Sequence, residues 1–183
     1  MIDDKVVTCG SAIKIKRSSS RSGDTHYLSS SNQSLGTGSG QQIVTFIPNR
    51  STYGTLWQVK SADGAKPCVP GEPIACNSII RLEHLETGKN LHSHMHKSVL
   101  SGQQEVSAFG NDGKGDESDN WKVECGAKYW RRETNFRLMH QNTVKYLGAS
   151  ATVKFDERNC GHGRYRIKFV LNRKTHTLKN KIL

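Results

Sequence analysis

Internal repetition is the feature of this 183-residue sequence that most constrains its fold. The segment 76–123 carries the signals of four short β-strands joined by polar turns and ends in Trp121-Lys122-Val123. Residues 9–59 carry the same signals in the same order and end in Trp57-Gln58-Val59, 64 residues before the second tryptophan. A repeated unit that cannot bury its own apolar face predicts one domain built from stacked copies.

A third and weaker copy begins near Phe136, where the run 137–140 (RLMH) echoes 81–84 (RLEH). It has no Gly-Gln-Gln segment, and we expect Tyr165-Arg166-Ile167 to take the place of Trp-x-Val. Three such copies predict an all-β protein, specifically a β-trefoil. Six strands would close a short barrel and three hairpins would cap one end, which removes exposed sheet edges.

We therefore expect a single trefoil over residues 1–171, with copies at about 5–60, 74–124 and 130–171, followed by a basic C-terminal tail, 172–183. The 17 glycines and the low hydrophobic content of 34% suit many short strands joined by turns. The tryptophans and the recurring Ile/Leu pairs would fill the core, because an indole buries a large apolar area.

Charge is unevenly distributed over the chain. The net charge is +11, and residues 158–183 contain eight Lys/Arg and no acidic residue. A basic tail can bind nucleic acid, anionic glycans or membrane surfaces. We favour a solvated terminus, as is common at the ends of domains. Nucleic acid is not an expected partner, because no base-reading module is recognisable.

The five cysteines predict two disulfides. In a four-stranded unit whose first and last strands are antiparallel, the start of the first strand lies near the end of the last. This geometry pairs Cys9 with Cys68 and Cys76 with Cys125, and leaves Cys160 unpaired. Each bridge would stabilise the fold by about 2–4 kcal/mol. The alternative is five buried thiols in a reducing compartment. No apolar run is long enough for a membrane span, and no secretory leader is visible.

The polar segments of the second copy offer candidate binding chemistry. His92, His94 and His96 alternate and would share one face of a strand, as a zinc or copper site requires, but we expect a polar pair bonding neighbouring backbone and no metal. The glutamines of both copies could bind a sugar or an extended peptide. We favour a structural role for them, in which they satisfy the turn backbone. The candidate recognition patch comprises His92, His94, Gln103, Gln104, Gln41 and Gln42.

Other motifs carry less weight. We expect the acidic loop with Asp112, Asp116, Glu117 and Asp119 to be a solvated turn, since its spacing does not fit a calcium loop. No Ser/His/Asp or Cys/His arrangement stands out, so we expect neither an enzyme nor a cofactor. Asn32 and Asn49 are the acceptor asparagines of two N-glycosylation sequons, both in predicted surface loops.

Three motifs together closely resemble the MIR domain: the run 91–94 (LHSH), the run 100–110 (LSGQQEVSAFG) and Asp119-Asn120-Trp121. The sequence is most similar to the stromal cell-derived factor 2 family. That resemblance implies a β-trefoil of three MIR repeats in the endoplasmic reticulum lumen. It further implies a non-catalytic protein that works in folding quality control with a J-domain co-chaperone and the lumenal heat-shock chaperone.

Alternative functions remain open beside this resemblance, and the sequence differs from the family at several positions. Unfolded or O-mannosylated chains are possible clients, because MIR modules also occur in protein O-mannosyltransferases. A carbohydrate-binding lectin of trefoil type, lumenal or secreted, is the alternative function, and the accessory domain of a glycosyltransferase is a third. The first copy has Leu28-Ser29-Ser30-Ser31 where the family has Leu-His-Ser-His. The sequence ends Lys181-Ile182-Leu183, which is not an acidic retention signal, so retention would have to come from a partner, or the sequence is truncated.

Overall fold

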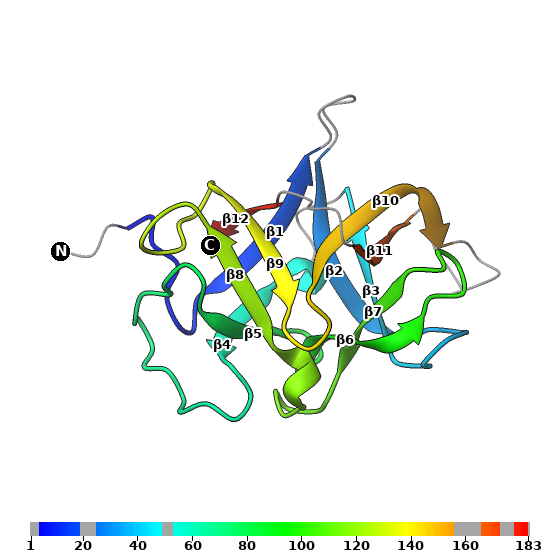
Figure 1. Cartoon of the computed structure of the whole chain (residues 1–183), viewed down its shortest axis with the longest axis horizontal. Helices are drawn as coiled ribbons and strands as arrows, with labels where there is room; N and C mark the ends of the chain where they lie inside the picture. The colour runs from blue at the N-terminus through cyan, green and yellow to red at the C-terminus, as the bar shows by residue number, and fades with distance from the viewer. Residues whose placement is uncertain (1–3, 19–24, 49–52, 156–165, 173–177, 183) are drawn as a thin grey trace.

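The computed structural model describes residues 4–18, 25–48, 53–155, 166–172 and 178–182. These residues form twelve β-strands and two short 3-10 turns, η1 (Tyr53–Thr55) and η2 (Glu117–Asp119) (Figure 1). The described part of the chain contains no helix long and apolar enough to cross a membrane. The strands are β1 (Ala12–Ser18), β2 (Thr25–Ser34), β3 (Gln42–Ile47), β4 (Trp57–Ser61), β5 (Ile79–His84), β6 (Lys89–Lys97), β7 (Gln104–Phe109), β8 (Trp121–Cys125), β9 (Asn135–His140), β10 (Lys145–Phe155), β11 (Arg166–Asn172) and β12 (Leu178–Ile182).

Six of these strands close into a ring. Antiparallel pairing runs from β1 to β4, β5, β8 and β9, then to β12 and back to β1. The other six form the hairpins β2–β3, β6–β7 and β10–β11. The inner strands of these hairpins pair with one another as β3–β7, β7–β11 and β11–β3. This is the predicted β-trefoil, a closed barrel with a cap of three hairpins.

A backbone feature before each repeat's first barrel strand fixes the threefold equivalence. Gly10, Asn77 and Glu133 all have positive φ, at 80°, 71° and 60°. Their N–H groups donate to the carbonyl oxygens of Val59, Val123 and Asn180, respectively. Asn180 of β12 therefore occupies the position that valine holds in the two Trp-x-Val strands.

The structure corrects the expected end of the third repeat. Leu178-Lys179-Asn180, not Tyr165-Arg166-Ile167, takes the place of Trp-x-Val. Ile167 instead belongs to the cap strand β11, and Tyr165 lies outside the described residues. The third repeat also extends beyond the expected boundary at residue 171, and the expected solvated tail is contradicted at residues 178–182. Residues 178–182 form a barrel strand in which Leu178 and Asn180 are buried.

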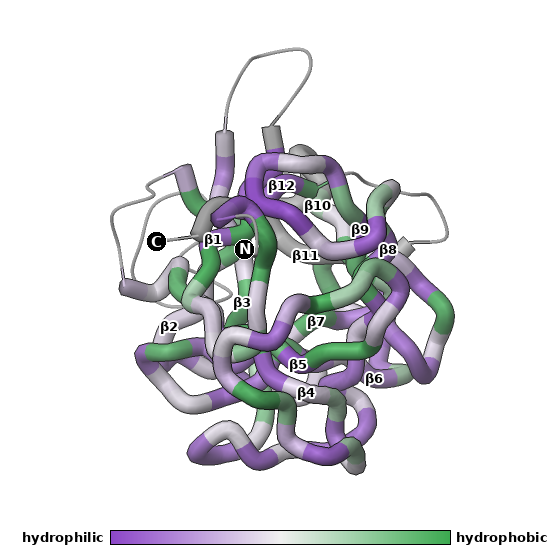
Figure 2. The backbone as a smooth tube through the Cα atoms, turned by 90° about the vertical axis from the view of Figure 1, so that its left-hand side faces the viewer, coloured by the Kyte–Doolittle hydropathy of each residue, from purple (hydrophilic) through white to green (hydrophobic). Residues whose placement is uncertain are grey.

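The core lies inside the barrel and beneath the cap. Trp57 and Trp121 are fully buried at equivalent positions, and their indole N–H groups donate to the carbonyls of Leu28 (3.2 Å) and Leu91 (2.8 Å). This confirms that the two tryptophans pack the core. Hydrophobic segments lie along strands such as β1, β5 and β7, while hydrophilic segments dominate the surrounding loops (Figure 2).

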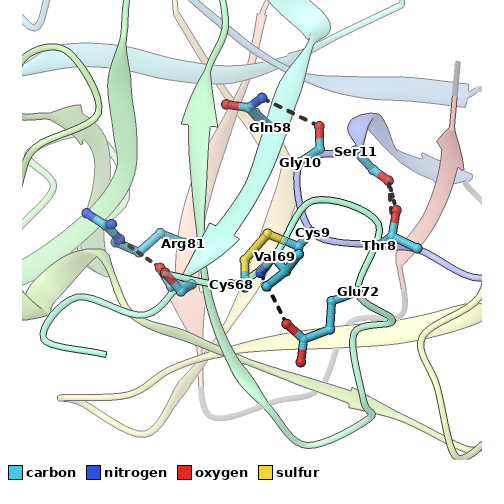
Figure 3. The surroundings of a disulfide bond; sticks show 10 residues. Thr8, Cys9, Gly10, Ser11, Gln58, Cys68, Val69, Glu72 and Arg81 are labelled. Carbon is cyan, nitrogen blue, oxygen red and sulfur yellow. Dashed lines mark hydrogen bonds between the residues drawn. A yellow bond between two sulfur atoms is a disulfide. The ribbon is translucent and has the colours of Figure 1, made fainter. Parts of the chain in front are cut away.

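Both predicted disulfides are present. Cys9 pairs with Cys68 and Cys76 with Cys125, at sequence separations of 59 and 49 residues. The first bridge ties the turn before β1 to the loop that follows β4 (Figure 3). Closing loops of this length stabilises the fold by about 4 kcal/mol each in the chain-entropy treatment. Cys160, expected to remain unpaired, lies outside the described residues.

Candidate functional site

Two glutamines of the candidate patch lie inside the protein, where one hairpin of the cap meets the next repeat. Gln42 on β3 donates through Nε2 to Ser30 Oγ (2.8 Å) and to Thr87 Oγ1 of the second repeat (2.7 Å). Gln104 on β7 is the equivalent residue of the second repeat and makes the same kind of contacts. It donates to Ser93 Oγ and Thr143 Oγ1, both at 2.9 Å. Both glutamines are buried, and each links one repeat to the following one.

Each of these contacts continues to a buried histidine that the sequence analysis did not single out. Thr87 Oγ1 lies 2.8 Å from Nδ1 of His84, and His84 Nε2 lies 3.1 Å from the carbonyl oxygen of Gly54. His140 repeats the arrangement with Thr143 Oγ1 (2.8 Å) and the Ser118 carbonyl (2.9 Å). We call each chain of contacts, from glutamine through threonine to histidine, a relay.

The hydrogen bonds of each relay define the protonation of its histidine. A carbonyl oxygen only accepts, so Nε2 carries the hydrogen and Nδ1 accepts from the threonine hydroxyl. Burial lowers the pKa of His84 and of His140, which favours this neutral form over the charged one. The recurring pattern of histidine followed three residues later by threonine was the signal available in the sequence.

His92 also lies inside the protein, beneath the loop that precedes β8. Its Nδ1 donates to Oδ1 of the fully buried Asp119 (2.8 Å). Oδ2 of Asp119 accepts from the backbone N–H of Asp116 (3.0 Å) and from Asn90 (3.2 Å). The acidic loop is therefore not simply a solvated turn, because Asp119 anchors η2 to β6. Side-chain ligand atoms of His92, Asp116 and Asp119 lie within 4.8 Å of one another, but the hydrogen bonds of the loop already engage them.

The next histidine along β6 reaches the surface. His94 is 18% exposed, and its Nε2 lies 3.1 Å from Oε1 of the buried Glu105. Ser39 donates to the same carboxylate oxygen. A Cβ at Gly38, whose φ is +76°, would collide with that carboxylate, so the glycine-rich loop packs closely onto β7. His96 is exposed, with its ring centroid 4.7 Å from that of His94.

The candidate patch therefore divides into an interior and a surface part. His92, Gln42 and Gln104 are buried and hold the fold together through side-chain hydrogen bonds. Gln103 is exposed, and Gln41 is half-buried, accepting from Ser107 Oγ at 2.5 Å. With His94, these two side chains form the part that can touch a partner, and we call the three the surface triad.

A polar hollow lies at the boundary between the first two repeats. It is lined by Asn32, Glu86 and Thr87. Asn32 is exposed, but it lies in β2, at a register irregularity between Ser30 and Ser34, and not in a loop as expected. Asn49, the other sequon asparagine, lies outside the described residues.

Comparisons with known proteins agree with this geometry. The family model of the MIR domain matches residues 21–178. Human stromal cell-derived factor 2 is 43% identical over 145 residues, which cover 79% of this chain and 66% of that protein. The crystal structure of the SDF2-like protein from Arabidopsis thaliana superposes with a TM-score of 0.82 at 31% identity, covering 96% of this chain and 94% of the other.

A protein O-mannosyltransferase complex from S. cerevisiae, solved with its sugar donor, contains a similar region. That match has a TM-score of 0.75 at 26% identity and covers 98% of this chain but only 26% of the other. The trefoil and these matches define a MIR-domain protein. The chain belongs to the MIR-domain family, and within it to the group of stromal cell-derived factor 2 and its relatives. It spans 63% to 66% of the length of curated relatives such as the mouse and human proteins.

Proposed function

We propose that this chain is a non-catalytic MIR protein of the endoplasmic reticulum lumen that serves as a co-chaperone component in folding quality control. Its partners would be a J-domain co-chaperone, the lumenal heat-shock chaperone, and unfolded or O-mannosylated clients. The observation that carries the proposal is the similarity to stromal cell-derived factor 2 over 79% of the chain.

The interior of the trefoil supports a non-catalytic role. His84 and His140 each have two hydrogen-bond partners, His92 is bonded to Asp119, and burial lowers the pKa of both relay histidines. General acid–base catalysis needs such groups within reach of a substrate proton. In this protein these three side chains are buried, so their hydrogen bonds serve the fold and binding is left to surface groups.

The two disulfides support a location in the secretory pathway. Disulfides persist in oxidising compartments and are rare in the cytosol. A lumenal or secreted protein would keep both bridges, and a mass shift after reduction and alkylation of protein from its native compartment tests this directly.

Affinity purification from lumenal extract tests the co-chaperone proposal. The purified chain, immobilised through an added tag, should retain a J-domain co-chaperone and a heat-shock chaperone, identified by mass spectrometry. The triple variant Gln41→Ala/His94→Ala/Gln103→Ala tests the surface triad, with Lys97→Ala on the exposed end of the same strand as a control. Recovery of neither chaperone by the wild-type chain would refute the proposal.

Carbohydrate binding is the second candidate function, and the polar hollow favours it. Asn32 and Glu86 line the hollow with an amide and a carboxylate, which can hydrogen-bond sugar hydroxyls, while the hydroxyl of Thr87 is already engaged by Gln42 and His84. A glycan array followed by titration would identify a ligand. Micromolar binding that Glu86→Gln abolishes, with no chaperone recovered from extract, would make this the leading function.

A further inference from the structure

The outer strands of the first two cap hairpins carry the same β-bulge. In β2, residues 31–33 lie opposite a single residue of β3, and in β6, residues 94–96 lie opposite a single residue of β7. A bulge interrupts the regular ladder and bends its strand. The middle residues of the two bulges, Asn32 and Met95, are both exposed. The bulge therefore explains how Asn32 reaches the surface from within a strand.

Of these two bulges, the one in β2 presents an acceptor for N-glycosylation. Asn32-Gln33-Ser34 is a sequon, and both Asn32 and Ser34 are exposed. The equivalent run in the second repeat is Met95-His96-Lys97, which has no acceptor asparagine. An attached glycan is bulky and stays on the surface, so it needs an exposed asparagine. The bulge in β2 meets this requirement.

The Asn32 side chain lies at the polar hollow. It lines the hollow together with Glu86 and Thr87 of the second repeat. The turn η1 lies beside them, because a Cβ at Gly54 would be 2.6 Å from the Ser30 carbonyl oxygen and 3.4 Å from Oε2 of Glu86. The backbone of η1 is therefore close both to the residue that precedes the bulge and to the carboxylate. A group attached to Asn32 has Glu86 and Thr87 as its neighbours.

The chemistry of the hollow suits the first sugar of an N-linked glycan. That sugar is an N-acetylhexosamine, and its hydroxyl groups and its amide N–H all donate hydrogen bonds. A carboxylate only accepts, and it accepts at both oxygens, so Glu86 complements these donors. Hydrogen bonds to a charged acceptor are also stronger than neutral ones. The volume of the hollow, about 390 Å³, lies in the range of sites for small ligands.

We propose that the hollow binds the protein's own N-linked glycan, attached to Asn32, with its first sugar against Glu86. The transfer forms a bond between Asn32 Nδ2 and the anomeric carbon of the first sugar. The amide gives up one hydrogen as a proton, and the bond from that carbon to the lipid pyrophosphate of the oligosaccharide donor breaks. A glycan bound in this way closes the hollow to an external sugar. The inference rests on the proposed location in the secretory pathway, where such donors are found.

Mass spectrometry of the whole chain tests the attachment. The chain is expressed behind a secretory leader in animal cells, and its glycans are released by peptide-N-glycosidase in heavy-oxygen water. We expect the peptide with Asn32 to show deamidation with incorporation of the heavy oxygen. Ser34→Ala and Asn32→Gln should each abolish this signal, whereas Asn49→Gln should leave it intact. An unmodified Asn32 in protein whose two disulfides have formed would overturn the proposal.

Nuclear Overhauser contacts test whether the first sugar lies in the hollow. The probe is the Asn49→Gln chain, with its remaining glycan trimmed by an endoglycosidase to a single N-acetylglucosamine on Asn32. We expect contacts between this sugar and the methyl group of Thr87, because Thr87 lines the hollow. A sugar that shows no contact with Thr87 points into solvent, and the proposed binding in the hollow is then wrong.

The rate of glycan release from the native protein measures the contribution of Glu86. Contact with the hollow protects the glycan from peptide-N-glycosidase, so Glu86→Ala should speed its release about fivefold, as expected for the loss of one hydrogen bond. Glu117→Ala removes an exposed carboxylate from η2, the equivalent turn of the next repeat, and should leave the rate unchanged. Equal rates for the wild type and Glu86→Ala would contradict the role of Glu86. Recovery of chaperones from extract is a separate measurement, so failure here leaves the co-chaperone proposal standing.

Discussion

The two relay histidines should make the stability of this protein fall steeply below neutral pH. Both have a pKa that burial depresses in the folded state, whereas in the unfolded chain a histidine titrates near about 6.5. Below that pH the two histidines bind protons in the unfolded state but not in the folded state, so the free energy of unfolding falls. The stabilisation is complete above the unfolded pKa and is lost as the pH drops toward the folded pKa.

The magnitude follows from proton linkage. Each histidine that stays neutral while its unfolded counterpart is charged costs about 1.4 kcal/mol per pH unit. Two of them therefore remove up to about 2.7 kcal/mol between pH 7.5 and pH 5.5. The relay explains the resistance to protonation. A charged imidazole would donate from Nδ1, and the threonine hydroxyl that now donates to it would lose its acceptor.

Urea denaturation followed by tryptophan fluorescence at pH 7.5, 6.5 and 5.5 measures this effect. The double variant His84→Gln/His140→Gln should be less stable at pH 7.5, since it breaks both relays, but should show a shallower pH dependence. His96→Gln, at an exposed position on β6, is the control and should keep the wild-type slope. A wild-type loss below about 1 kcal/mol, or an unchanged slope in the double variant, would refute the reasoning.

Three further predictions address the fold and its modification. Cys76→Ser/Cys125→Ser opens a 49-residue loop and should lower the free energy of unfolding by about 4 kcal/mol in chemical denaturation; a loss below about 1 kcal/mol would contradict it. Trp121→Phe removes the bond to the Leu91 carbonyl and should cost about 2 kcal/mol by the same assay, whereas a neutral result would mean that the indole N–H is dispensable. Asn32→Gln should remove one N-glycan from protein expressed through the secretory pathway, and an unchanged mass would show that the site is unused.

The first two repeats could be predicted from sequence because their barrel strands keep the same side chains at the same positions. Trp57 and Trp121 fill equivalent places in the core, and the disulfides follow from the positions of the cysteines around those strands. The third repeat lacks this signal. Leu178 fills the place of a tryptophan with a much smaller side chain, so neither size nor aromatic character identifies β12, and the nearest aromatic in a similar pattern, Tyr165, was misleading.

The interior of the candidate site could not be predicted for a different reason. His92, Asp119 and Gln104 are polar, and polar residues in a turn-rich segment usually face water. Here each is buried with a partner that is distant in sequence: Asp119 lies 27 residues from His92. Such burial is tolerated because the tertiary fold supplies hydrogen-bond partners for His92, for Asp119 and for the amide nitrogen of Gln104, and those partners have no local sequence signature.

The position of β12 in the ring has a consequence for assembly. The first and last strands of the chain, β1 and β12, pair with each other. The five residues from Leu178 to Ile182 are therefore the strand that closes the barrel. Without them β1 and β9 would each present a row of unpaired backbone donors and acceptors across a gap, a template onto which another chain could add. In this protein β12 pairs with both strands and fills that gap, so β1 and β9 do not offer this template to a second copy of the chain.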